Sequence, residues 1–192
     1  MKIALASDHA GFALKEHLRG WIGKEHDVTD FGTRSDASCD FPDFAHPAAM
    51  AVAEHTCDRA VIVDGAGYPS GIVANKIHGV YAAVCHDTAA ARLSREHSDT
   101  NVLCLGAMVI GQLLADEIVK VWLATAFAGG RYATRVEKVK ALESQHLLPR
   151  WQRPRDVITL ADLRAGLLDG EGLVVGPATR VTASVRDLVS RP

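Results

Sequence analysis

Residues 61–76, VIVDGAGYPSGIVANK, decide the fold of this chain. An apolar, β-branched run ends at Asp64, a glycine-rich turn follows, and the residues from Ser70 onward read as the start of a helix. Such a junction presents several backbone N–H groups at the positive end of a helix, which favours an anion such as phosphate. The alternative is a tight turn whose glycines serve backbone geometry only. At the mouth of this loop, Asp64 could act as a base on a bound molecule.

The composition fits one ordinary domain with an extension. The chain has 192 residues, 48% of them hydrophobic, which is enough for a substantial core. A net charge of −2 provides no basic field for nucleic acid or an anionic membrane. No apolar run reaches the length of a membrane span, and the N-terminal one is too short for a signal peptide. We therefore expect a cytosolic protein.

The cysteines and histidines show no metal-binding pattern. The four cysteines form no CxxC pair, and Cys85 and Cys104 lie inside apolar, strand-like runs, which favours buried thiols over disulfides or zinc. The nine histidines show no HExxH or similar spacing. We therefore predict no metal.

Short apolar β runs alternate with helical segments over the first two thirds of the chain. Strands are expected at residues 2–7, 26–31, 59–63, 80–85 and 101–105, and helices at 11–24, 44–55, 70–78, 88–96 and 111–127. This alternation predicts an α/β fold, a Rossmann-like, doubly wound parallel sheet of about five strands in three layers. In such sheets, ligands bind beyond the carboxyl ends of the strands.

Polar residues gather where two of these strands end. Asp8 and His9 follow the first strand and Asp64 ends the third, so all three fall at the carboxyl edge, where a site is expected. His97 follows a helix, and its position is less determined. Two alternatives stay open: His9 caps a helix beside Asp8, and His97 is a surface histidine.

A basic element follows the last predicted helix of the sheet domain. Arg131 and Arg135 come after a Gly-Gly pair and lie four residues apart on a new helix. At that spacing they share one helix face and can fork around a phosphate. The alternative is a solvated face that pairs with Glu137 or another neighbour.

Five segments, taken in order, resemble the ribose-5-phosphate isomerase B family, which includes the galactose-6-phosphate isomerase subunits. The similarity extends over roughly residues 1–145, with matching order and spacing. The segments are Asp8-His9-Ala10-Gly11, the loop 64–71, Ala74-Asn75-Lys76, the run 94–101 (SREHSDTN), and Gly129-Gly130-Arg131 followed by Arg135.

The resemblance implies a homodimer or homotetramer with active sites at the subunit interface. Members interconvert an aldose phosphate and a ketose phosphate through a cis-enediolate, without metal or other cofactor. By position, His9, Arg131 and Arg135 would form a phosphate clamp, with the arginines contributed by the partner subunit. Asp8 would contact substrate hydroxyls, and His97 would help to open the cyclic sugar.

The same resemblance assigns the loop to substrate. Its backbone N–H groups would stabilise the enediolate oxygen as an oxyanion hole does, and the residues that line it are Gly65, Ala66, Gly67, Ser70 and Gly71. The catalytic set would be Asp64, His97 and Ser98. A carboxylate base must be partly desolvated, a condition that Asp64 would meet at the end of an apolar strand.

The chain departs from the family pattern in its chemical residues. Many members carry a cysteine base at the position of Asp64, and others pair an aspartate there with a glutamate at the position of Ser70. Ala66 replaces a threonine, Ser98 replaces an asparagine, and Phe41 replaces a tyrosine. The phosphate-binding residues match and the proton-transfer residues do not.

Three interpretations remain open. The chain is a ribose-5-phosphate isomerase with a shifted base, an isomerase of another sugar phosphate such as a tetrose or hexose phosphate, or a sugar-phosphate-binding protein without turnover. A tetrose 4-phosphate cannot close the usual five-membered ring, so it would need ring opening least.

The C-terminal part is unlike the usual family ending. We expect an isomerase domain over residues 1–148, a Pro/Arg-rich linker over 149–155 and an extension over 156–192 that docks on this or another chain. The extension faintly resembles short C-terminal extensions of enzymes associated with bacterial microcompartments, which would make it a targeting or assembly module. The alternative is an arm that strengthens the oligomer. Its expected elements are a helix over 156–168 capped by Thr159, a strand at 173–175 and a helix over 182–189.

Overall fold

The computed structural model describes residues 1–147, 157–158 and 180–181. The chain divides into two units, Met1–Glu137 and Lys138–Pro192. Within the described residues no helix is long and apolar enough to cross a membrane.

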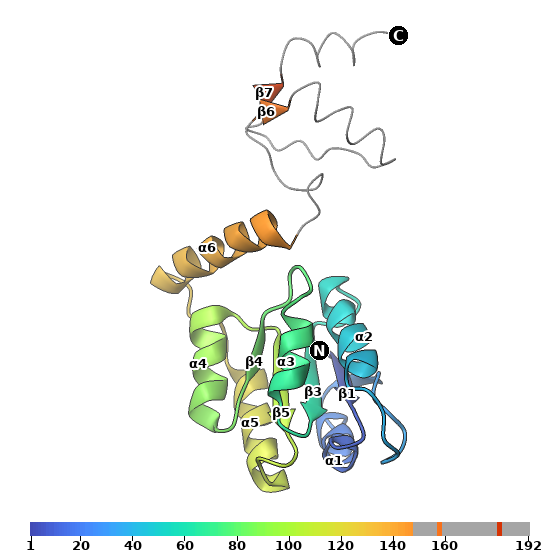
Figure 1. Ribbon diagram of the computed structural model, residues 1–192. Coiled ribbons are helices and arrows are strands. Elements are labelled where there is room, and N and C mark those ends of the chain that lie inside the picture. The colour runs from blue at the N-terminus through green and yellow to red at the C-terminus, as the bar shows by residue number, and fades with distance from the viewer. Residues whose placement is uncertain (148–156, 159–179, 182–192) are drawn as a thin grey trace, which may run out of the picture. The chain divides into compact units, whose positions relative to one another are not determined.

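The first unit is built on a five-stranded parallel sheet with the strand order β2-β1-β3-β5-β4. The strands are β1 (Lys2–Ser7), β2 (Asp27–Asp30), β3 (Arg59–Asp64), β4 (Ala82–Val84) and β5 (Val102–Gly106). The helices are α1 (Phe12–Ile22), α2 (Pro42–Ala53), α3 (Tyr68–Ala74), α4 (Thr88–Ser98), α5 (Gln112–Ala124) and α6 (Arg131–His146). The predicted doubly wound α/β fold is confirmed (Figure 1).

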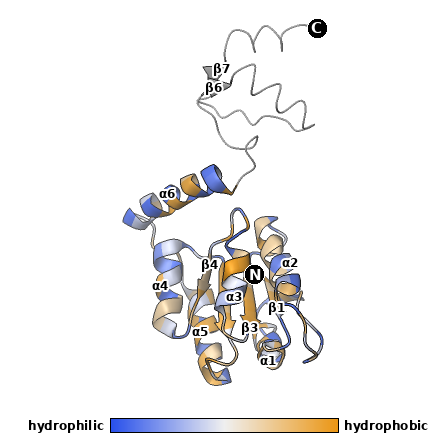
Figure 2. Ribbon diagram, in the orientation of Figure 1, coloured by the Kyte–Doolittle hydropathy of each residue, from blue (hydrophilic) through white to orange (hydrophobic). Residues whose placement is uncertain are grey.

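Two apolar layers enclose the sheet because the central strands are hydrophobic on both faces. On one face Leu5, Val63 and Leu103 pack with residues of α1, α4 and α5. On the other face Ala4 and Ile62 pack with residues of α2 and α3. Figure 2 shows the matching distribution, with hydrophobic residues on the strands and hydrophilic ones mainly on outer helix faces and loops.

Two glycines shape the chain around the carboxyl end of β3, Gly11 through a close approach and Gly67 through its backbone conformation. A Cβ at Gly11 would lie 2.5 Å from the carbonyl oxygen of Val63, so only glycine lets the start of α1 lie against this strand. Gly67 has φ of +86°, a left-handed conformation that turns the loop into α3. The predicted helix over 70–78 is therefore shifted to Tyr68–Ala74, with Pro69 in its first turn.

The described part of the second unit holds the end of α6 and one pair of short strands. β6 (Val157–Ile158) pairs in parallel with β7 (Arg180–Val181). The helix predicted from residue 156 is therefore wrong at Val157 and Ile158, whose β-branched side chains favour strand. The strand expected at 173–175 and the helix expected over 182–189 lie outside the described residues.

Candidate active site

The topology places a switch point between β1 and β3 at the carboxyl edge of the sheet, the position of the ligand-binding crevice in doubly wound sheets. β1 leads into α1 on one face, whereas β3 leads into α3 on the other face. Neighbouring parallel strands whose connections leave in opposite directions form a switch point, which is where doubly wound sheets bind ligands. Asp8 and His9 directly follow β1 and Asp64 ends β3, so the structure places all three at this switch point.

Asp8 and His9 are held by neighbouring backbone. The buried Asp8 accepts a hydrogen bond through Oδ1 from the Gly11 N–H at 3.0 Å, at the start of α1. The His9 ring places Nδ1 3.1 Å from the carbonyl oxygen of Cys39 and 3.3 Å from its N–H. Either contact occupies Nδ1, and the other ring nitrogen, Nε2, is then the one suited to a ligand.

Asp64 organises the loop that follows β3. Its side chain is buried, with 1% of the residue exposed. Oδ1 accepts hydrogen bonds from the N–H groups of Ala66 at 2.8 Å and Gly67 at 2.5 Å, and Oδ2 accepts one from Ser70 at 2.9 Å. Because Gly67, the residue before α3, lacks a capping side chain, Asp64 supplies the oxygen acceptor for the first turn.

This arrangement differs from the oxyanion-hole loop expected from the sequence. The N–H groups of Ala66, Gly67 and Ser70 point at Asp64, and that of Gly71 donates to the carbonyl of Gly67 at 3.2 Å. In this structure the Asp64 carboxylate therefore occupies the N–H groups that were expected to bind a substrate oxygen. A carboxylate has about four lone-pair positions, so Oδ2, with one donor, keeps capacity for a proton or a substrate hydroxyl.

The turn after β5 adds residues that the sequence reasoning missed. Ala107 donates its N–H to the carbonyl of Asp64 at 2.8 Å, and Met108 donates to that of Gly65 at 2.9 Å. The Met108 side chain is 81% exposed, and its sulfur would lie 3.4 Å from a Cβ added at Gly65. Met108 closely follows the carboxyl end of β5, and this position in the sequence is the signal that could have marked it as a residue near the site.

Cys104 lies behind Asp64, in β5, and is fully buried. Burial raises the pKa of its thiol well above the ordinary range, and the charge of Asp64 raises this pKa further. Because the thiol stays protonated, Cys104 cannot replace the cysteine base that is missing at position 64.

A second cluster forms where α4 ends and α6 begins. The His97 ring stacks on the Tyr132 ring, with centroids 4.0 Å apart and an interplanar angle of 12°. The guanidinium groups of Arg131 and Arg135 lie 5.0 and 5.4 Å from the centre of the same ring. The structure therefore brings the predicted ring-opening histidine and both clamp arginines together. Ser98, the last residue of α4, is exposed beside them.

The two clusters lie at opposite edges of the sheet. α4 runs back from the carboxyl edge, so His97 comes just before the first residue of β5, at the amino edge. The N–H of Ala128 donates to the carbonyl of Glu96 at 3.1 Å and fixes the start of α6 at that edge. The six residues of β3 span roughly 20 Å. One sugar phosphate is too short to contact both clusters of the same chain.

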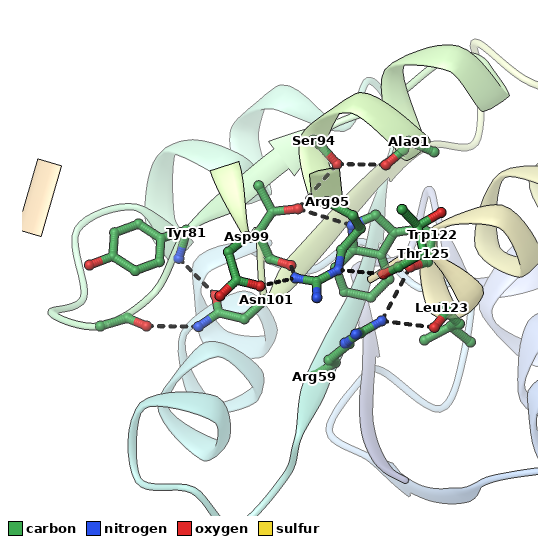
Figure 3. Close-up of polar contacts among 12 residues, drawn as sticks. Arg59, Tyr81, Ala91, Ser94, Arg95, Asp99, Asn101, Trp122, Leu123 and Thr125 are labelled. Atoms are coloured by element: carbon green, nitrogen blue, oxygen red, sulfur yellow. Dashed lines mark hydrogen bonds and ion pairs between the residues drawn. The ribbon is translucent and has the colours of Figure 1, made fainter. Parts of the chain in front are cut away.

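A buried arginine anchors the amino-edge cluster (Figure 3). Arg95 donates to the Asp99 carboxylate at 2.8 Å and to the carbonyls of Thr100 at 2.5 Å and Thr125 at 3.3 Å. Its guanidinium also lies 5.9 Å from the centre of the Trp122 ring. These contacts join the end of α4, the entry to β5 and the end of α5, and so fix the backbone on either side of His97.

Arg59 and Trp122 add further hydrogen bonds around Arg95. Arg59 donates to the carbonyls of Trp122 at 3.2 Å and Leu123 at 3.0 Å, which ties the end of α5 to the start of β3. Burial lowers the pKa of Arg59, and the nearby charge of Arg95 lowers it further. The indole N–H of Trp122 donates to the Thr100 hydroxyl at 3.0 Å. These hydrogen bonds tie the end of α5 to the starts of β3 and β5 at the amino edge.

In the part of the chain that the structure describes, no group of three or more His, Cys, Asp or Glu residues is arranged to hold a metal ion. The groups that the site does offer are carboxylates, imidazoles and guanidinium groups. These side chains can transfer protons and bind an anion.

Comparisons with known proteins agree on one family. A family model described as ribose/galactose isomerase matches residues 3–139. Ribose-5-phosphate isomerase B of Escherichia coli is 41% identical over 145 residues, covering 75% of this chain and 97% of that protein. A solved structure of ribose-5-phosphate isomerase B of Clostridium thermocellum has a TM-score of 0.75 and 45% identity, covering 76% of this chain and 99% of that one.

The chain is also similar to a relative that is named for a substrate other than ribose 5-phosphate. D-erythrulose-4-phosphate isomerase of Pectobacterium atrosepticum is 36% identical over 147 residues, covering 76% of this chain and 97% of that protein. The family match ends at residue 139, so it gives no support to the microcompartment association expected for the extension.

The anchor predicts a large stability loss on substitution of Arg95. Arg95→Met keeps the stem but removes donors from buried acceptors, and we expect the free energy of unfolding in urea to fall by about 3 kcal/mol. Arg92→Met is the matched control on the same helix, because Arg92 makes only an exposed ion pair with Glu96 at 3.1 Å. The control should lose less than about 1 kcal/mol. Equal losses in the two variants would contradict the anchoring role.

Proposed function

Because this chain belongs to the ribose/galactose isomerase family, we propose that it interconverts the aldose and ketose forms of a sugar phosphate through a cis-enediolate. The observation that carries the proposal is the switch point between β1 and β3, where Asp8, His9 and Asp64 lie at neighbouring strand ends. Moving a proton between two adjacent sugar carbons requires a base and an acid, together with groups that stabilise charge on the substrate oxygen. The crevice offers two carboxylates and an imidazole for these roles.

Asp64 is the proposed base. It is buried at the mouth of the crevice, and its Oδ2 carries a single backbone donor. Cys104, the cysteine next to it, is held as a neutral thiol. Asp8, whose Oδ1 is engaged by Gly11, would contact the substrate hydroxyls, and the loop 65–71 would border the reacting carbons.

We infer that a complete site takes residues from two copies of the chain. Asp8, His9 and Asp64 lie at the carboxyl edge, whereas His97 and the two arginines lie at the amino edge. A second copy that presents its amino edge to the crevice would bring a phosphate clamp and a ring-opening acid to the carboxylates. A homodimer is the smallest such assembly, and a homotetramer can be built from two of them. Ser98, beside His97, would join the catalytic residues.

Ribose 5-phosphate is the first expected substrate, because ribose-5-phosphate isomerase B proteins share up to 45% identity with the chain among the comparisons above. A tetrose 4-phosphate is the second candidate. It is favoured by the similarity to D-erythrulose-4-phosphate isomerase and by the loss of a hydroxyl at Ala66.

The C-terminal extension is proposed as a docking or assembly module of residues 156–192, joined by a linker at 149–155. It lies beyond the family match, which ends at residue 139. Deleting the residues after Pro149 and measuring the size of the assembly by ultracentrifugation tests this proposal. We expect a smaller assembly that retains isomerase activity. An assembly of unchanged subunit number would contradict a role of the extension in joining copies of this chain and leave docking on another protein.

The base assignment predicts different activities for two variants of similar size. Asp64→Ser and Asp64→Cys both remove the carboxylate that holds the loop, so they should lose similar stability. Asp64→Ser has no group able to accept the proton, and its kcat on ribose 5-phosphate should fall by about 10²–10⁴. Asp64→Cys supplies the thiolate that many family members use there, and it should keep at least about ten times the activity of Asp64→Ser.

Thermal unfolding of both variants is the control for the shared structural loss, and the assay panel includes erythrose 4-phosphate, allose 6-phosphate and galactose 6-phosphate. Near wild-type activity in Asp64→Ser, or equal activities in the two variants, would remove Asp64 as the base. Measurable binding with no turnover of any sugar phosphate by the wild type would instead indicate a binding protein.

A further inference from the structure

Tyr132 contacts three of the predicted substrate-binding or catalytic side chains at once. Its ring stacks on His97 at 4.0 Å and lies beneath the guanidinium groups of Arg131 and Arg135, 5.0 and 5.4 Å from its centre. Its phenol oxygen accepts a hydrogen bond from Nη2 of Arg131 at 3.0 Å. A single aromatic side chain therefore joins both arginines to the histidine.

The local backbone builds this contact from residues far apart in the sequence. Gly129 and Gly130 both have positive φ, +63° and +55°, and they form the turn that begins α6. The Tyr132 N–H donates to the carbonyl of Gly129 at 3.0 Å, and the preceding loop is bonded to the end of α4. This turn sets Tyr132 against His97 although the two are 35 positions apart in the sequence.

The Tyr132 ring offsets the charge repulsion between the two arginines of the clamp. Two guanidinium groups four residues apart repel each other, and both arginines are exposed to solvent. An aromatic face attracts such cations. Arginine also loses side-chain entropy when it is immobilised, so a ring that restricts it beforehand lowers the loss on binding an anion.

Stacking on Tyr132 orients the His97 ring without blocking its nitrogens. Parallel contact restricts the imidazole plane but leaves the ring edge, where the nitrogens lie, available. Within residues 1–147 the structure records no hydrogen bond to the His97 ring. The ring can therefore be oriented by Tyr132 and still donate or accept a proton at its edge.

We propose that Tyr132 is a positioning residue, which holds the two arginines and His97 in one orientation before the sugar phosphate arrives. The proposal rests on the proposed function, because it assigns Tyr132 to the clamp of that site. Tyr132 belongs to neither apolar cluster of the sheet and is only half-buried, so its contacts with these three side chains are not part of the packing of the core.

The test compares a variant that keeps the ring with one that loses it. Tyr132→Phe loses the hydrogen bond to Arg131 and keeps the aromatic face, so its KM for ribose 5-phosphate should rise by less than about threefold. Tyr132→Leu should raise KM, and the inhibition constant of inorganic phosphate, by about tenfold or more. Its kcat should also fall, because His97 loses its orientation.

The variant Arg131→Ala distinguishes a failure of the positioning role of Tyr132 from a failure of the proposed phosphate clamp. If Arg131→Ala leaves KM and phosphate inhibition unchanged, the clamp itself is wrong. If Arg131→Ala weakens both while Tyr132→Leu matches the wild type, only the positioning role is overturned. The double variant should be worse than Arg131→Ala alone, but by less than the sum of the two single effects, because the two changes share the Arg131 contact while Arg135 and His97 still depend on the ring.

Proton NMR of His97 reports the stack without any catalysis. The ring-current shift of its imidazole protons should persist in Tyr132→Phe and vanish in Tyr132→Leu. If Tyr132→Phe and Tyr132→Leu raise KM and the phosphate inhibition constant equally, the aromatic ring does not position the clamp. Should Tyr132→Leu fail to fold, Tyr132→Gln carries the same comparison with a more soluble side chain.

Discussion

The hydrogen bonds between the Asp64 carboxylate and the N–H groups of Ala66, Gly67 and Ser70 are the constraint on which the rest of the site depends. A buried carboxylate is tolerated only when its oxygens are satisfied, and this loop satisfies both of them. The same bonds fix the entrance to α3 and keep the crevice between β1 and β3 in shape. The group that would take the substrate proton is thus also the group that holds the loop after β3, so a change at position 64 affects the loop and the chemistry together.

The second feature of the molecule is the separation of charge between the two edges of one sheet. Carboxylates lie where β1 and β3 end, and the arginines with His97 lie where α4 ends and α6 begins. Strand length sets this separation, and the network around Arg95 fixes its basic end. A phosphorylated sugar needs both ends, with cations for its phosphate and a base for its carbon. In our account, two copies supply them by placing unlike edges together.

The sequence predicts the sheet well because each central strand is a continuous apolar run bounded by turn residues, as in residues 59–63. It also places Asp8 and His9 correctly, since strand ends follow from strand limits. It does not predict the acceptor of the loop N–H groups, which depends on the Asp64 rotamer and on a positive φ at Gly67. Tyr132 and Met108 were missed because their contacts form only in three dimensions. The helix predicted at Val157 was wrong because pairing with a distant strand prevails there.

The central claim is that the active site is completed between two copies of the chain, and mixing two inactive variants tests it most directly. Asp64→Ser impairs the carboxyl-edge half, and the double variant Arg131→Ala/Arg135→Ala impairs the amino-edge half. After co-refolding, a mixed dimer has one site with both defects and one site with neither. With random exchange of equal amounts, activity should rise to about a quarter of the wild-type value per chain. Activity that stays at the mean of the two separate variants, although mixed dimers are present, would contradict a site shared between copies.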